Sequence, residues 1–103
     1  MNERLLDMLE YRVVLGVLAT SLDGLVVAHA GLGPDDAELL AAASAAQPND
    51  DAYSFDTTRG GILHVLRGHD IRLIVLTETG APTQTIVDLM HEELQALEAS
   101  IAV

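Results

Sequence analysis

Four histidines are the side chains in this sequence best suited to proton transfer or metal binding near neutral pH. They are His29, His64, His69 and His91, and they are scattered over different predicted elements. His64 lies on a largely apolar strand face, which favours a hydrogen-bonded histidine in the core or at an interface, and His69 fits a turn. Neither belongs to a Ser-His-Asp arrangement that the sequence alone identifies. The histidines therefore predict no catalytic residue.

One group of metal-ligating residue types has helical spacing. Asp88, His91 and Glu92 stand at positions i, i+3 and i+4 of the last predicted helix. A zinc site needs further ligands and partners that orient them. The sequence offers no distant ligand for this group, so a solvated helix face explains these residues better. We expect neither a metal nor a cofactor.

The segment Gly31-Leu32-Gly33 follows a predicted strand and precedes a helix, as a dinucleotide-binding loop does. It lacks the third glycine, and Asp35 and Asp36 would repel a phosphate at the helix start. The sequence also has no cysteine, and its five basic residues are all arginine. Thiolate nucleophiles, lysine Schiff bases and Walker-type phosphate loops are therefore excluded.

Composition predicts a single small domain spanning residues 1–103, with an aliphatic core. Half of the residues are hydrophobic but only 3% are aromatic, and the formal net charge is −11. Such a charge repels phosphate backbones and anionic lipid, which argues against a nucleic-acid or membrane-surface role. Acids interrupt the N-terminus early, and no apolar stretch is long enough to span a bilayer. We expect a cytoplasmic protein.

Hydrophobic periodicity divides the chain into eight elements. The predicted helices cover residues 3–11, 34–47 and 84–101, and the predicted strands cover residues 13–21, 25–30, 52–57, 62–67 and 70–77. Asp23-Gly24 between two apolar runs indicates a hairpin turn. Both strand faces are largely apolar, so helices should cover both sides of the sheet. The predicted fold class is α+β, a five-stranded antiparallel sheet flanked by helices in the order α-β-β-α-β-β-β-α.

Turn lengths predict which residues share a sheet face. Gly68-His69 has the composition of a two-residue turn, which would place His64 opposite Leu73. An even-length corner before residue 60 would bring Tyr53 and Phe55 onto the same face as His64.

This order of elements resembles the Roadblock family, named for the dynein light chain. The segment Gly16-Val17-Leu18-Ala19-Thr20-Ser21-Leu22-Asp23-Gly24-Leu25-Val26-Val27-Ala28 is similar to the first hairpin of the family. Leu73-Ile74-Val75-Leu76-Thr77 resembles its last strand, and residues 35–47 resemble its central helix, acidic first and then rich in alanine. The helix departs from the family pattern because Pro48 ends it abruptly.

The resemblance implies both a fold and a function. The fold would be the Roadblock, longin and profilin-like sandwich, and the protein would be a homodimer in which third strands pair and central helices pack side by side. Such proteins are not enzymes. They serve as platforms or regulators for small Ras-like GTPases, as the Mgl-type proteins of bacterial polarity systems do.

Small and apolar residues mark the expected dimer interface. For the stripe on the central helix, packing only on its own sheet is the alternative. For the two aromatic residues of the edge strand, the alternative is that they cap the core, and both alternatives stay open. The candidate interface residues are Leu39, Ala42, Ala43, Ala46, Tyr53 and Phe55. Phe55→Asp or Ala43→Glu should then separate the dimer into folded monomers.

Arg67 and Arg72, near the tip of the last hairpin, are candidate contacts for an acidic partner or for a nucleotide bound by a partner. Pairing with Asp70 across the hairpin is the plainer account. Two other functional classes stay open beside the interaction module. One is a profilin-like or sensor-like domain that binds a small ligand, and the other is an enzyme of unknown type.

Overall fold

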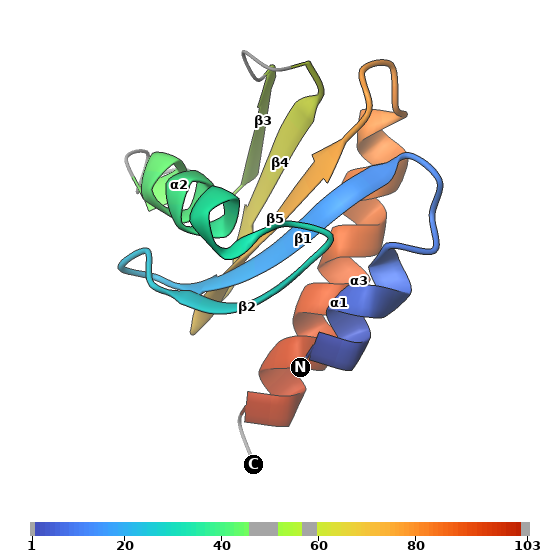
Figure 1. The fold of residues 1–103 in the computed structure, drawn as a ribbon. Coiled ribbons are helices and arrows are strands. Elements are labelled where there is room, and N and C mark those ends of the chain that lie inside the picture. Colours follow the sequence, from blue (N-terminus) through green and yellow to red (C-terminus); the bar gives the residue numbers. More distant parts are fainter. Residues whose placement is uncertain (1, 46–51, 57–59, 102–103) are drawn as a thin grey trace.

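The computed structural model describes residues 2–45, 52–56 and 60–101, which form three helices and five strands. In chain order the elements are α1 (Asn2–Met8), β1 (Val14–Ser21), β2 (Val26–Ala30), α2 (Pro34–Ala45), β3 (Ala52–Asp56), β4 (Ile62–Arg67), β5 (Ile71–Thr77) and α3 (Thr83–Ile101). All strand pairs are antiparallel, in the order β2-β1-β5-β4-β3. Helix α2 covers one face of the sheet, and α1 and α3 cover the other (Figure 1).

The turn between β1 and β2 forms at the predicted Asp23-Gly24. The backbone N–H of Ser21 donates to the carbonyl of Leu25 at 2.8 Å, and Gly24 adopts a φ of 95°. The Ser21 hydroxyl donates to the Asp23 carboxylate, and this bond holds the pKa of Asp23 below its ordinary value. A glycine at positive φ and a short side chain that bonds within the turn explain why the chain reverses here.

Two apolar cores separate the sheet from its helices. The core on the α1 and α3 face includes Leu5, Met8, Val17, Leu73, Val75, Ile86, Met90 and Leu97. The core on the α2 face is smaller and consists of Leu18, Ala37, Ala41, Leu63, Val65 and Ile74. Alternate residues along each central strand supply the two cores, because successive side chains of a strand point to opposite faces.

The edge strand β3 requires a correction to the predicted five-stranded sandwich. The core side chains that the structure describes come from α1, β1, β2, α2, β4, β5 and α3, and none of them comes from β3. The part of the sandwich whose core the structure describes thus has four strands and three helices, in the order α-β-β-α-β-β-α. Strand β3 is added at its margin by pairing with β4 over five residues. Ala52 and Ser54 are exposed and small, so they contribute little apolar burial.

The hairpin between β4 and β5 has a different register from the one predicted. Leu66 pairs with Leu73 and His64 with Val75, two residues away from the expected partners. Three residues, 68–70, connect the two strands, and the N–H of Gly68 donates to the carbonyl of Ile71 at 2.8 Å. A shift of two residues leaves every side chain on its predicted face, because the side-chain period of a strand is two.

The predicted face of Tyr53 and Phe55 is wrong. These positions pair with Val65 and Leu63, which lie in the α2 core, whereas His64 belongs to the opposite face. Because Asp56 pairs with Ile62, the corner between them contains an odd number of residues. An odd corner reverses the side-chain alternation that an even corner would preserve.

Candidate functional site

A series of hydrogen-bonded polar side chains links the edge strand to the middle of the sheet. The hydroxyl of Ser54 on β3 lies 2.8 Å from Nδ1 of His64 on β4. Nε2 of the same imidazole lies 3.0 Å from the hydroxyl of Thr77 on β5. His64 and Thr77 are fully buried, while Ser54 is exposed. The structure thus brings together a serine and a histidine that the sequence did not connect.

The proton positions in this hydrogen-bonded series can be assigned starting from Thr77, its buried end. The Thr77 hydroxyl donates to the carbonyl of Ile62 at 3.5 Å, so its oxygen accepts the N–H of His64 Nε2. Nδ1 is then the unprotonated nitrogen and accepts the hydroxyl proton of Ser54. Burial lowers the pKa of His64, which favours this neutral form. These hydrogen bonds link β3 to the sheet. The described side chains of β3 bury little apolar surface there.

We expect the fold to lose stability as the pH falls below about 6.5, the ordinary histidine value. Because burial lowers the pKa of His64, the unfolded chain takes up this proton at a higher pH than the folded chain does. The stability that His64 contributes is therefore fully present above about pH 6.5. It decreases as the pH falls toward the pKa of His64 in the folded state. Urea unfolding at pH 7 and pH 5.5 measures the loss.

The pH prediction compares two variants with the native chain, because carboxylates also contribute to any pH dependence. His64→Gln should reduce the difference between the two pH values. His69→Gln alters an exposed turn residue and should leave it unchanged. Equal pH dependence in the native chain and His64→Gln would contradict the assigned role of His64.

Helix α2 presents opposite faces to the sheet and to solvent. Ala37, Ala41 and Ser44 are buried against the sheet. On the other side Leu39, Ala42 and Ala43 are exposed and form what we name the outer α2 stripe. Leu39 is the largest side chain of this stripe and is 61% exposed. The stripe therefore does not pack on the sheet of its own chain, and its contact with a partner stays a prediction.

Three further candidate interface residues are less well defined. Ala46 lies outside the described residues. The side chains of Tyr53 and Phe55 also lie outside them, although their backbone belongs to β3. Strand β3 is at the end of the sheet order, so one of its sides has no neighbouring strand within the described chain.

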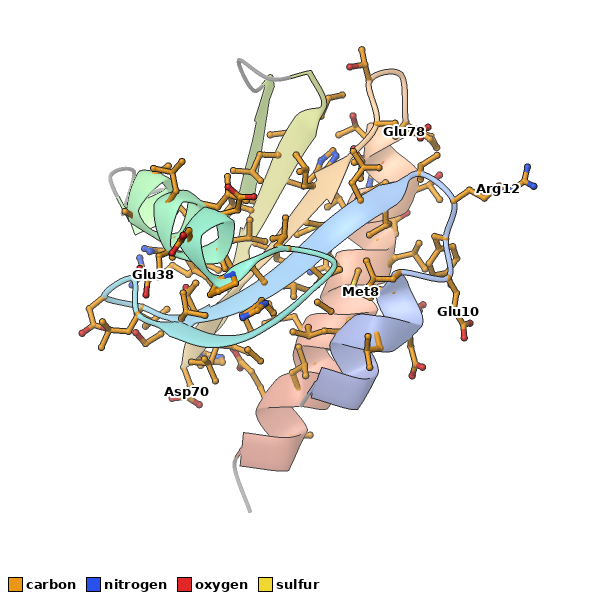
Figure 2. All side chains as sticks on the ribbon, viewed as in Figure 1. Met8, Glu10, Arg12, Glu38, Asp70 and Glu78 are labelled. Atoms are coloured by element: carbon orange, nitrogen blue, oxygen red, sulfur yellow. The ribbon has the colours of Figure 1, made fainter. Side chains whose placement is uncertain are left out.

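The two candidate arginines lie directly opposite each other. Arg67 on β4 pairs with Arg72 on β5, and both lie on the α2 face. Arg67 is half-buried, whereas Arg72 is only 2% exposed. Asp70 is at the end of the hairpin (Figure 2), and its N–H approaches Oε1 of Glu98 at 3.4 Å. The pairing of the arginines with the Asp70 carboxylate stays a prediction.

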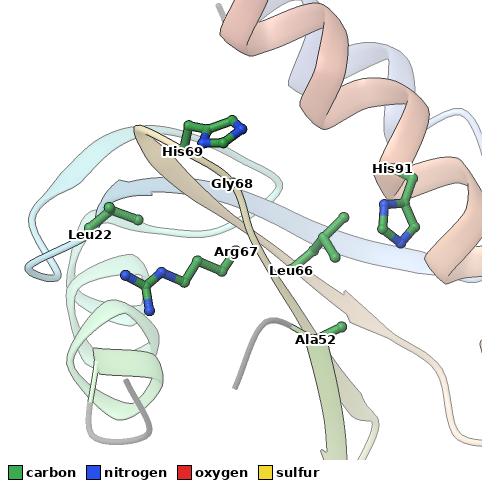
Figure 3. Close-up of a pocket in the computed structure, with 7 residues that line it drawn as sticks. All are labelled: Leu22, Ala52, Leu66, Arg67, Gly68, His69 and His91. Atoms are coloured by element: carbon green, nitrogen blue, oxygen red, sulfur yellow. The ribbon is translucent and has the colours of Figure 1, made fainter. Parts of the chain in front are cut away.

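A depression of about 600 Å³ lies beside the β4–β5 hairpin (Figure 3). Its lining consists of Leu22, Ala52, Leu66, Arg67, Gly68, His69 and His91. Among its described lining residues are two imidazoles and one guanidinium, and none of these residues carries a carboxylate. Elsewhere on α3, Asp88 accepts a hydrogen bond from Gln84 at 2.9 Å. Within the described ranges, no three metal-ligating side chains come together.

Solved structures of bacterial domains share this architecture. One Roadblock/LC7 domain from Streptomyces avermitilis superposes with a TM-score of 0.87 over 100% of this chain and 98% of its own, at 17% identity. Another from the same organism gives a TM-score of 0.81 over 92% of this chain and 95% of its own, at 26% identity. The chain has the Roadblock/LC7 fold. The resemblance identified from the three sequence segments is confirmed at this level.

The Roadblock/LC7 fold also relates the chain to MglB. The gliding protein MglB from Thermus thermophilus matches with a TM-score of 0.66 over 93% of this chain and 87% of its own, at 21% identity. An MglB structure with a tetrameric arrangement gives 0.68 over 92% and 82%, at 20% identity. No family model and no curated protein matches at the level of sequence. In the described part, no helix has the length and apolar character needed to cross a bilayer.

Proposed function

We propose that the chain is a non-catalytic interaction module that forms a homodimer and regulates or positions a small Ras-like GTPase in the bacterial cytoplasm. The outer α2 stripe is the observation that carries this proposal. It exposes Leu39, Ala42 and Ala43 on a molecule whose net charge is −11. An apolar stripe on so acidic a surface is typical of a face that another protein covers. The Roadblock/LC7 fold shared with MglB supports the GTPase-related role.

The chemistry of the stripe suits a second copy of the same helix. Leu39, Ala42 and Ala43 follow the i, i+3, i+4 spacing of one helix face. Alanine lets two helix backbones approach closely, and a two-fold axis would set the same stripe of both chains in contact. Pairing of the two β3 edges about the same axis would satisfy their free backbone groups. Each subunit would then bury its least charged surface.

Solution mass tests the homodimer. We expect a species of about twice the 10.9 kDa chain mass in light scattering at micromolar concentration. Because each subunit carries a net charge of −11, added salt should screen the repulsion and strengthen association. A monomer at every concentration and salt level would refute the dimer.

The GTPase role needs a separate measurement. A small Ras-like GTPase encoded beside this chain in its genome would be purified and loaded with GDP or with a non-hydrolysable GTP analogue. We expect the chain to bind one nucleotide state more tightly than the other, since regulation requires different affinities for the two states. Equal binding to both, or binding to neither, would leave the chain a dimer without this function.

A further inference from the structure

Strand β2 is an edge of the sheet that lacks most of the features by which proteins protect an edge. It is at the end of the strand order, so its outer side has no neighbouring strand within the described chain (Figure 1). Its sequence, Val-Val-Ala-His-Ala, contains neither lysine, nor an acidic residue, nor proline. Natural edge strands usually have such residues, because an open row of N–H and C=O groups can pair with another strand.

Two large apolar side chains are exposed along this edge. Leu25, directly before β2, is 67% exposed, and Val27 is 50% exposed. The pairing of β2 with β1 shifts by one residue at Val27, which is therefore the extra residue of a β-bulge. A bulge changes the direction of its side chain relative to the regular strand. The edge of β2 thus combines open backbone groups with exposed apolar surface.

Acidic residues lie on both sides of β2 in the chain. The connecting segments 22–25 and 31–38 contain no basic residue, and they include the exposed carboxylates of Asp23, Asp35 and Glu38. Repulsion between these charges opposes the pairing of β2 with β2 of a second copy. A strand that carries basic residues would instead be attracted to this edge.

We propose that β2 binds an extended segment of a partner protein as an added strand, and that apolar and basic residues alternate in this segment. Backbone hydrogen bonds provide affinity in complexes of this kind, and alternate side chains provide specificity. The apolar residues would contact Leu25 and Val27, and the basic residues would lie near Asp23 and Asp35. Strand β3 is at the opposite end of the sheet, so the proposed homodimer would leave the β2 edge open.

A short capped peptide of alternating valine and arginine is the probe for this edge. Because the net charge of −11 attracts any basic peptide, the comparison peptide contains the same residues in two separate blocks. Calorimetry measures both dissociation constants, and hydrogen exchange measures protection of the amides of residues 26–30. We expect the alternating peptide to bind at least about tenfold more tightly and to slow exchange in β2, since only its side chains match a strand.

Two variants, Val27→Lys and Leu39→Lys, form a matched pair because each adds one positive charge at an exposed apolar position. Lysine on an edge strand opposes pairing, so Val27→Lys should lose both the preference for the alternating peptide and the protection of β2. Leu39→Lys alters the outer α2 stripe and should keep both. The solution mass of the two variants reports on the homodimer separately, so the failure of one proposal is distinguishable from the failure of the other.

Three results would overturn the proposal of strand addition at β2. The first is equal binding of the two peptides, or no binding of either. The second is an equal loss of the preference in Val27→Lys and Leu39→Lys. The third is exchange in β2 that is slow in the concentrated chain alone and becomes faster on dilution, because β2 would then pair with a second copy.

Discussion

The Ala43→Glu variant is expected to be a folded monomer under conditions in which the native chain is a dimer. Ala43 is an exposed member of the outer α2 stripe, so glutamate fits the fold of one subunit. In the proposed dimer the two-fold axis would bring both new carboxylates into one apolar contact. Burying an unpaired charge at an interface costs roughly 2–5 kcal/mol. That cost corresponds to a dimer dissociation constant at least about thirtyfold higher.

Sedimentation of the variant over a range of concentrations measures this effect, and circular dichroism confirms that its helices are intact. Gln95→Glu is the matched control, because it adds the same charge at an exposed position of α3. It should leave the dimer constant nearly unchanged. If Ala43→Glu remains as dimeric as Gln95→Glu, the outer α2 stripe is not the interface.

The Gly61→Ala variant is expected to lose roughly 2–4 kcal/mol of unfolding free energy, a large part of the stability of a domain this size. Gly61 precedes β4 at a φ of 110°, a conformation that residues with a Cβ rarely adopt. A Cβ at this position would also lie 2.7 Å from the carbonyl oxygen of Thr77. That oxygen belongs to the backbone, and Thr77 is paired with Ile62, so relief would require the β4–β5 pairing to shift.

Gly33→Ala provides the comparison for this loss. Gly33 precedes α2, its φ is not in the positive range, and a Cβ there would meet no atom within 4 Å. Alanine restricts the unfolded chain but is a poorer N-cap than glycine, and these opposing effects should leave a change below about 1 kcal/mol. Urea unfolding of both variants gives the two free energies. Similar values would show that the chain before β4 adapts to a side chain at Gly61.

Local sequence features predicted most elements of this domain. The periodicity of residues 84–101 and the turn at Asp23-Gly24 both act within a few residues of chain, so they are visible without the fold. The outer α2 stripe was also visible as a pattern. Its exposure was not, because alanine-rich helices have apolar residues on more than one face.

The corner before β4 shows where sequence reasoning failed. The side-chain period of a strand is two, so one residue more or less in a connection exchanges the two faces. The expected even corner placed Tyr53 and Phe55 on the face of His64, and it therefore hid the pairing of Ser54 with His64. The number of residues in the connection depends on where the strands on each side begin to pair, and local sequence does not determine this.

The burial of the Arg72 charge could not be predicted from the sequence either. In the sequence it stands near a hairpin tip beside Asp70, where a solvated ion pair is the ordinary expectation. In the structure it is buried between β1 and β4, beneath the face that α2 covers. Helix periods and turns depend on neighbouring residues, and net charge depends on composition, so the printed sequence was enough to establish them. The partners of Ser54, His64 and Arg72 come from strands distant in the chain, and only the packed sheet decides which of them meet and which polar groups are left without a partner.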